Sequence, residues 1–351
     1  MTPMSTSGTT VPVASIICPA FNEESGIESA IRRLRVCLDG LPVSAEVLII
    51  NDGSTDGTVA AAIGAVAGDR RFRILSHKTN FGRGRAMRTG FQEARGEILI
   101  TTEADLSWGE GVIGAMIDAL QRDARLDAVF ASPHLTGGGY RNVPWHRIML
   151  SRFGNRILRA LYPSPISMTT GMTRAYRVGA IRGQSFMRDG KELHLEIAHR
   201  LMSLGYNIGE VPAILSWPAD VAAKNSRGKR TDWRKIRKLI VSHLAFGFFQ
   251  GISRIIGPVI VLLTIAIVVF GAWAVRNALI GAPSIYLVTL VGVQLILWAT
   301  LVVGYFILTH VFHIQSELWR LQSGLASDPA AVARDSRSYY HEQPLPTQAE
   351  G

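Results

Sequence analysis

The chain has 351 residues, of which 48% are hydrophobic, and it carries a formal net charge of +10. This length supports one large folded core with further segments around it. The two cysteines, Cys18 and Cys37, lie outside any CxxC pattern and argue against a disulfide framework. Residues 1–11 lack the charged start and apolar centre of a secretory signal, so we expect the bulk of the chain in the cytosol.

The first half of the chain alternates between strand and helix patterns. The expected strands are 13–18, 46–50, 72–75, 97–102 and 128–131, and the expected helices are 22–38 with Asn22 as its cap, a helix capped by Thr55 or Asp56, 83–95 and 109–122. This order predicts a mostly parallel sheet with right-handed crossovers. Further on we expect a glycine loop at 137–139, an amphipathic helix at 145–161 and a helix at 196–204 that ends at Gly205.

Polar motifs follow several of these strands. Asp52 comes directly after the second strand, where an acid can accept hydrogen bonds from a base or ribose, although a simple turn explains it as well. Residues 80–85, with Arg83 and Arg85, open a helix whose N-terminus can attract phosphate. Each motif alone is weak evidence for a ligand site. All of them are expected at the same edge of one sheet, however, and this combination argues against chance.

The acids Glu103 and Asp105 leave the fourth strand two residues apart. Hard cations such as Mg²⁺ take carboxylate oxygens together with the oxygens of a substrate phosphate. Open α/β sheets bind ligands at the carboxyl ends of their strands. The pair therefore indicates a nucleotide diphosphate held through a metal ion, with a solvated acidic turn as the plain alternative.

Two uncharged apolar stretches, residues 255–275 and 283–309, are long enough to cross a bilayer, which takes about 20 residues per helix. The short loop at 276–282 predicts a hairpin, and a buried helical pair in a soluble protein is the weaker alternative. Eight Lys and Arg residues between 224 and 238 precede the first stretch. This block favours an anionic membrane surface over nucleic acid, and the positive-inside rule places both chain ends in the cytoplasm.

Residues 232–249 read as a basic helix with one apolar stripe, which suits either a membrane surface or an ordinary core face. The tail from Leu325 is polar, and we expect it to be poorly ordered. The expected domains are a flexible N-terminus (1–12), a catalytic α/β domain (13–228), an amphipathic interfacial region (229–253), two transmembrane helices (254–314) and a cytoplasmic tail (315–351).

Taken together, the motifs resemble a family 2 glycosyltransferase of the GT-A fold, in the branch of dolichyl- and polyprenyl-phosphate sugar synthases. The resemblance covers about residues 13–238 and is carried by residues 19–24, 51–58, 80–84, 103–107, 137–139 with 144–147, and Glu196 with 205–206 and 210–212. The membrane hairpin fits members of that branch with two or more spans. The Gln-x-x-Arg-Trp pattern of processive polysaccharide synthases is absent from the sequence, which argues against polymerisation.

Three positions depart from the family pattern. Glu103 stands where the family usually has the first Asp of Asp-x-Asp. Pro133 follows Ser132 where an arginine is common, so Arg147 or Arg152 would have to supply that phosphate contact. The family's basic Gly-x-Ser-Lys-like stretch has only a loose counterpart at 224–227.

The resemblance implies inverting transfer of a sugar from a nucleotide diphosphate sugar to a polyprenyl phosphate, with Mg²⁺ or Mn²⁺ as cofactor. Asp105 and Glu103 would be the catalytic residues, and Glu103, Asp105 and Ser107 the metal ligands. The implied donor contacts are Pro19, Phe21, Asn22, Glu23, Asp52, Gly82, Arg83 and Ala104. The implied acceptor or phosphate contacts are Ser132, Arg147, Arg152 and Arg227.

These features predict an integral membrane enzyme of a bacterial plasma membrane that works at the cytoplasmic face without nucleic acid. Two alternatives stay open: a membrane-tethered nucleotide-sugar-binding protein without catalysis, and a glycosyltransferase with another lipid acceptor, such as diacylglycerol or ceramide. The sugar, the choice between uridine and guanosine donors, and the oligomeric state are open, although the hairpin offers a surface for packing between subunits.

Overall fold

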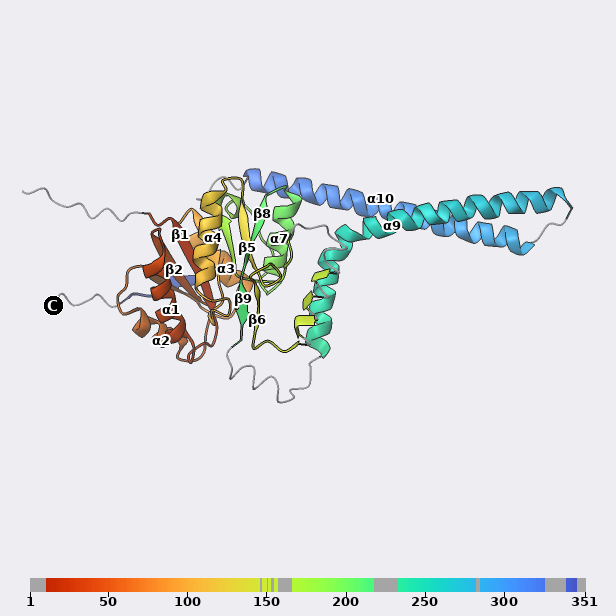
Figure 1. Cartoon of the computed structure of the whole chain (residues 1–351). Coiled ribbons are helices and arrows are strands. Elements are labelled where there is room, and N and C mark those ends of the chain that lie inside the picture. The colour runs from red at the N-terminus through yellow and green to blue at the C-terminus, as the bar shows by residue number, and fades with distance from the viewer. Residues whose placement is uncertain are drawn as a thin grey trace, which may run out of the picture. The chain divides into compact units, whose positions relative to one another are not determined.

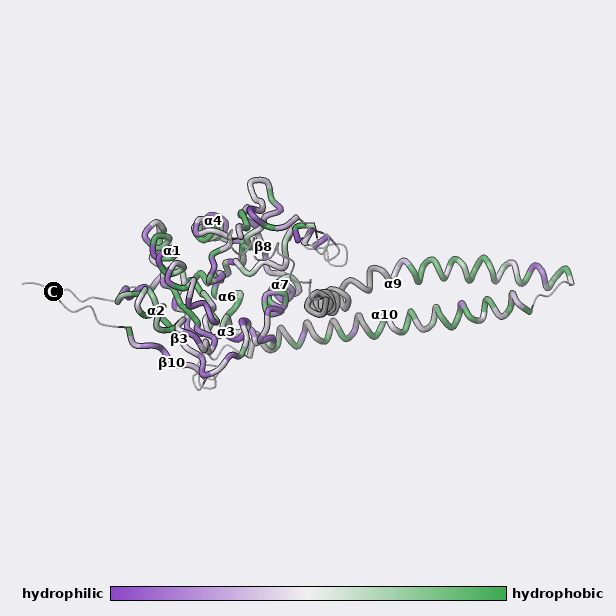
Figure 2. The backbone as a smooth tube through the Cα atoms, turned by 90° about the horizontal axis from the view of Figure 1, so that it is seen from below, coloured by the Kyte–Doolittle hydropathy of each residue, from purple (hydrophilic) through white to green (hydrophobic). Residues whose placement is uncertain are grey.

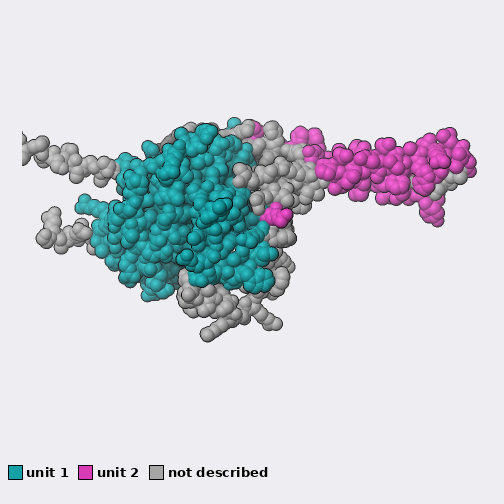
Figure 3. Space-filling model, in the orientation of Figure 1, with its two compact units in different colours: residues 1–155, 164–231, 320–351 teal, residues 156–163, 232–319 magenta. Residues whose placement is uncertain are grey.

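The computed structural model describes residues 11–145, 147–149, 151–152, 155–156, 166–217, 233–281, 285–325 and 339–345, with backbone alone for 233–255. The chain divides into two compact units, shown in different colours in Figure 3. Residues 1–155, 164–231 and 320–351 form the first unit, and residues 156–163 and 232–319 form the second.

The first unit is built on a mixed sheet of eight described strands in the order β10-β3-β2-β1-β4-β7-β5-β8. The strands are β1 (Ala14–Ala20), β2 (Ala45–Asn51), β3 (Phe72–His77), β4 (Ile98–Thr101), β5 (Ala128–Ser132), β7 (Arg174–Arg177), β8 (Ile208–Pro212) and β10 (Tyr340–Glu342). Neighbours from β3 to β4 run parallel, as expected, whereas β7 lies antiparallel between β4 and β5. The predicted mostly parallel sheet is confirmed.

Helices cover both faces of this sheet (Figure 1). The first face packs against α1 (Ile27–Gly40), α2 (Thr58–Val66) and α4 (Gly111–Arg122), and the second against α3 (Arg83–Glu93), α6 (Val178–Ile181) and α7 (Leu193–Ser203). Burial on both faces explains why β2 is apolar almost throughout. Helix α7 ends as expected, with Gly205 at a φ of +81° just beyond it.

A short ribbon of β6 (Gly139–Arg141) and β9 (Ile214–Ser216) pairs in parallel apart from the main sheet. The predicted helix at 145–161 is only partly within the described residues. The described positions from Trp145 to Arg156 are helical.

The tail does not follow the prediction throughout. Strand β10 lies antiparallel to β3 and closes that edge of the sheet (Figure 2). Glu342 pairs with Arg73 through Nε at 2.8 Å and Nη2 at 3.1 Å. The expectation of a poorly ordered tail was therefore wrong for residues 339–345, because backbone pairing with β3 and the ion pair with Arg73 hold this segment on the sheet.

The second unit contains most of two long helices, α9 (Trp233–Leu279) and α10 (Ile285–Leu325). Within them, Ile256–Leu279 and Val288–Ile307 have the length and composition of membrane spans. Trp298 donates a hydrogen bond from Nε1 to the Thr264 hydroxyl at 2.8 Å, so the two helices touch as a hairpin. The expected interfacial helix at 232–249 is the first part of the continuous helix α9.

Candidate active site

The loops after β1 and β2 are tied together at one edge of the sheet. The backbone N–H of Asn22 donates to the Ser54 hydroxyl at 3.0 Å, and Thr55 N–H donates to the side-chain oxygen of Asn22 at 2.9 Å. The backbone N–H of Glu23 donates to the Thr58 hydroxyl at 2.8 Å. Asn22 therefore joins two loops at a φ of +55°, and the prediction that it caps the first helix was wrong, since α1 begins at Ile27.

Asp52 organises the loop that leads into α3. Its carboxylate is 2% exposed and accepts hydrogen bonds from the backbone N–H groups of Phe81 at 3.1 Å and Gly82 at 2.8 Å. His77 lies 2.8 Å from the same carboxylate through Nδ1 and contacts Thr89 through Nε2 at 2.9 Å. In this structure Asp52 thus positions the residues expected to meet the donor, and its own contact with a donor stays a prediction.

The N-terminus of α3 is occupied by protein. The carbonyl oxygen of Asp189 accepts hydrogen bonds from the N–H groups of Gly84 at 2.7 Å and Arg85 at 3.2 Å. A Cβ on Gly82 would lie 2.5 Å from that same oxygen. These glycines admit the backbone of residues 188–190, so the expectation that the helix end attracts phosphate was wrong for these two N–H groups.

Charged side chains from three of these segments meet beside the acidic loop after β4. Arg83 donates from Nη1 to Oε1 of Glu103 at 3.1 Å. Burial and the nearby Asp105 raise the pKa of Glu103, and the same two causes raise the pKa of Glu23, while Arg83 opposes both shifts. Cys18, buried in β1, has its pKa raised to about 12, first by burial and then by Asp105 and Glu23. Three carboxylates against one guanidinium leave an excess of negative charge at this edge of the sheet.

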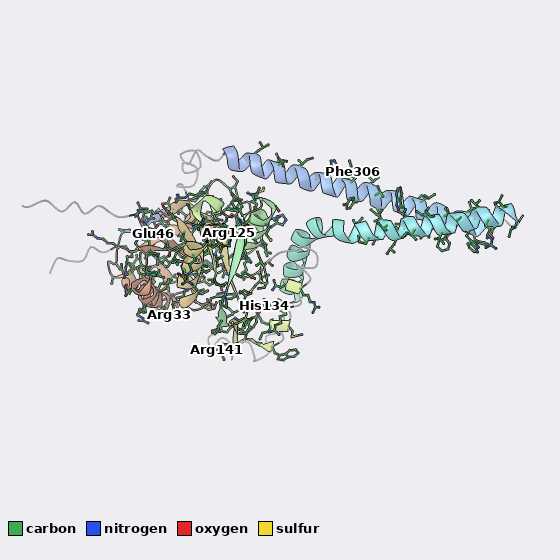
Figure 4. All side chains as sticks on the ribbon, turned by 45° about the horizontal axis from the view of Figure 1, so that its top comes forward. Arg33, Glu46, Arg125, His134, Arg141 and Phe306 are labelled. Atoms are coloured by element: carbon green, nitrogen blue, oxygen red, sulfur yellow. The ribbon has the colours of Figure 1, made fainter. Side chains whose placement is uncertain are left out.

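The acidic loop is held in shape from within and from α1. Ser107 donates its backbone N–H to Oδ1 of Asp105 at 3.0 Å and its hydroxyl to Oε2 of Glu103 at 3.2 Å. Arg33, labelled in Figure 4, donates to the backbone carbonyls of Asp105 and Leu106, each at 3.2 Å, and also pairs with Glu110. Asp105 itself is exposed at the surface.

The described residues contain no cluster of three or more His, Cys, Asp or Glu side chains arranged to hold a metal ion. Glu103 and Asp105 are oxygen donors of the kind that Mg²⁺ and Mn²⁺ prefer, in a site whose charge favours a cation. A divalent ion that keeps waters and takes phosphate oxygens needs only one or two protein carboxylates. The donor set therefore fits such an ion, with Ser107 placed to orient both carboxylates.

The other predicted donor contacts lie on the same rim. Pro19 lies next to the last residue of β1 and is partly exposed, Phe21 is 43% exposed just beyond the strand, and Ala104 lies between the two acids. The structure thus brings the predicted donor and metal positions to one edge of the sheet.

The predicted acceptor contacts do not form a single cluster. Ser132 is fully buried, and its hydroxyl lies 2.5 Å from that of Ser167, which also donates to Glu210. Arg147 lies over the ring of Trp217 at 5.0 Å, and Arg152 is exposed on the helical segment nearby. Arg227 lies outside the described residues.

Two supports of the site were missed in the sequence. Arg33 looks like one more charged residue on a helix, and only its distance from the loop carbonyls reveals its role. Glu196 was noted as part of a motif without a role. It is 6% exposed and accepts hydrogen bonds from the N–H groups of Met187 and Arg188, which fixes the segment that covers α3.

Comparisons with known proteins give a consistent picture. Residues 15–183 match the model of the family described as glycosyl transferase family 2. Polyprenol monophosphomannose synthase of Mycolicibacterium smegmatis is 29% identical over 204 residues, which cover 56% of this chain and 75% of that protein. Undecaprenyl-phosphate 4-deoxy-4-formamido-L-arabinose transferase of Aeromonas hydrophila is 28% identical over 173 residues, 49% of this chain and 51% of the relative.

Among solved structures, glucosyl-3-phosphoglycerate synthase of Mycobacterium tuberculosis in complex with UDP aligns with a TM-score of 0.51 at 19% identity. The alignment covers 67% of this chain and 80% of the other. A likeness at this identity shows a shared fold.

Proposed function

We propose that this protein transfers a sugar from a nucleotide diphosphate sugar to a polyprenyl phosphate at a membrane surface, because residues 15–183 match the model of glycosyl transferase family 2. The observation that carries the proposal is the group formed by Glu103, Asp105, Arg83 and Glu23 at the carboxyl edge of the sheet. The mostly parallel α/β domain agrees with the GT-A fold that the sequence predicts. One relative is by its name a synthase of polyprenol monophosphomannose and the other an undecaprenyl-phosphate sugar transferase, which supports this class of acceptor.

The proposed cofactor is Mg²⁺ or Mn²⁺, which Glu103 and Asp105 would hold when the donor is bound. When bound, such an ion neutralises charge that develops on a leaving diphosphate. Arg83, which is partly exposed beside Glu103, would add a charge-assisted hydrogen bond to the same diphosphate. Asp52 keeps the backbone at Phe81 and Gly82 fixed, so that the donor meets a preformed edge.

The acceptor needs little activation. A phosphate monoester has a second pKa of about 6, so most of it is dianionic at neutral pH and needs no strong general base. Displacement of the diphosphate by an oxygen of this phosphate, in line from the opposite side, inverts the anomeric centre. Arg147 and Arg152 are our candidates for drawing the acceptor phosphate to the site, because both carry exposed guanidinium groups.

The topology of the chain supports a membrane hairpin with both ends on one side. The chain leaves the sheet domain before α9 and returns to the same sheet at β10, and both candidate spans lie between these points. With two membrane crossings, β10 would return to the same side of the membrane as the catalytic domain. The basic residues before α9 favour the cytoplasm as that side.

The test is a transfer assay with purified full-length protein, radiolabelled nucleotide sugars, Mn²⁺ and a short polyprenyl phosphate. A lipid-soluble product that mild acid cleaves supports a sugar phosphodiester. A product that resists mild acid and forms on diacylglycerol or ceramide would show that the acceptor is this lipid and not a polyprenyl phosphate. Nucleotide-sugar binding without any product across the donors would instead identify a binding protein.

A further inference from the structure

We propose that the C-terminal segment, residues 339–345, is a positioning element of the donor site that locks the loop before α3. The inference rests on the proposed function for its kinetic consequences, but its structural part can be measured without catalysis. Strand β10 follows α10, which contains the second candidate span. The segment that follows the helical hairpin thus lies against the residues that shape the donor edge.

The segment is anchored firmly to the sheet. Tyr340, His341 and Glu342 pair with β3, and Gln343 donates its backbone N–H to the Ile74 carbonyl at 2.8 Å. The side chain of Arg73, which is only 9% exposed, holds Glu342 together with Glu93 on α3. The Tyr340 hydroxyl also donates to Glu93 at 2.5 Å. This anchor combines backbone pairing with an ionic contact in which the arginine is buried and Glu342 is half exposed.

The same segment touches the donor loop through aromatic side chains. The Tyr339 ring meets the Phe81 ring edge to face, with centroids 6.0 Å apart, and the Arg85 guanidinium lies 5.0 Å from the Tyr339 centroid. The His77 ring stands between Phe81 at 5.6 Å and Tyr340 at 6.4 Å. The tail therefore contacts the loop next to the two backbone N–H groups that donate hydrogen bonds to Asp52.

These contacts form a continuous path to the catalytic edge. Tyr339 packs on Phe81, Phe81 and Gly82 are hydrogen bonded to Asp52, and the next residue is Arg83, which pairs with Glu103. An edge strand that only blunted the sheet would need the backbone pairing alone. The ring of Tyr339 adds a contact to the loop itself, which is the part that we assign to donor binding.

Three substitutions separate positioning from edge protection. Tyr339→Ala removes the ring and leaves the residues of β10 intact, Tyr339→Phe keeps the ring, and His341→Ala alters an exposed side chain of the same strand. We expect Tyr339→Ala to raise the donor KM about threefold to tenfold, the scale of one aromatic contact. The acceptor KM should stay unchanged, and Tyr339→Phe and His341→Ala should behave like the unaltered protein.

A second measurement does not depend on turnover. Hydrogen–deuterium exchange of full-length protein in nanodiscs should become faster at residues 79–86 in Tyr339→Ala, and stay unchanged there in His341→Ala. Unaltered exchange in this loop would overturn the inference, as would a donor KM within twofold of the unaltered protein. If the unaltered protein forms no product from any donor, the proposed function fails, and the exchange result still decides the role of the tail.

Discussion

Arg83 and Glu103 form an ion pair, at 3.1 Å between Nη1 and Oε1, that connects the start of α3 to the acidic loop after β4. The pair is partly open, with side-chain exposures of 39% for Arg83 and 26% for Glu103. Both side chains can therefore exchange their mutual contact for a ligand. A guanidinium that also interacts electrostatically with Glu23 is suited to a substrate that brings phosphate and a divalent ion together.

Replacing Arg83 by Gln should weaken donor binding. The substitution removes a charge-assisted hydrogen bond donor while it keeps a polar side chain of similar length. We expect the donor KM to rise about 10- to 100-fold, since hydrogen bonds to charged groups contribute about 1.5–3 kcal/mol. Initial rates against donor concentration measure the effect. Arg125→Gln, at an exposed ion pair with Asp123, is the control and should leave the KM unchanged.

Asp105→Asn should lower the transfer rate at least about 100-fold, which is the scale expected when a group that stabilises leaving-group charge is removed. The protein should still fold, because Asp105 is exposed and its Oδ1 can go on accepting the Ser107 N–H as an amide oxygen. Rates and the apparent unfolding temperature should be measured together. Asp118→Asn on the outer side of α4 is the matched control, and near-normal transfer by Asp105→Asn would refute the role of this carboxylate.

Arg33→Ala should slow transfer although Arg33 is expected to touch no substrate. Loss of its contacts with the carbonyls of Asp105 and Leu106 frees a loop whose Leu106 has a φ of +46°. We expect kcat to fall about tenfold, because misplacement of catalytic groups is costly. Arg32→Ala is the control, since the neighbouring Arg32 is exposed and pairs with Glu28. Equal rates for both variants would contradict the positioning role.

Local patterns predicted the parallel part of the sheet because alternating apolar strands and amphipathic helices carry their own periodicity. They also predicted that Asp52, Arg83, Glu103 and Asp105 lie at one edge, since the ends of parallel strands meet there. What they could not show were contacts made at long range. The insertion of β7 between β4 and β5 and the docking of β10 on β3 are of this kind.

The glycines at the start of α3 are a second case in which the sequence could not show a long-range contact. Gly82 and Gly84 are the residues that a phosphate-binding loop would have, and the sequence alone cannot tell a phosphate from a backbone segment as the close neighbour. In the structure the neighbour is the segment at 188–190, more than a hundred residues away in sequence.

Gly84→Ala should therefore destabilise the domain. Its Cβ would lie 2.6 Å from the Gly190 carbonyl oxygen and 2.7 Å from that of Arg188, both backbone atoms that cannot rotate away. We expect a loss of about 1–3 kcal/mol, as for other overpacked positions. Gly64→Ala in α2 is the control, because nothing lies within 4 Å of its Cβ position, and it should be neutral or slightly stabilising. Denaturant unfolding of the two variants would show the difference, and equal stabilities would refute the close approach.

Binding of Mn²⁺ should depend on pH through Glu103 and Glu23. Their pKa values are raised, first by burial and then by Asp105, so protons compete with the ion at a higher pH than they would for ordinary carboxylates. The sign follows: Mn²⁺ affinity should be full well above these raised pKa values and should fall as the pH drops through them. The increase in apparent unfolding temperature on adding Mn²⁺ should therefore be larger at pH 7.5 than at about pH 5. Asp105→Asn should lose most of this increase at both pH values, and an increase that does not change with pH would show that Glu103 does not hold the ion.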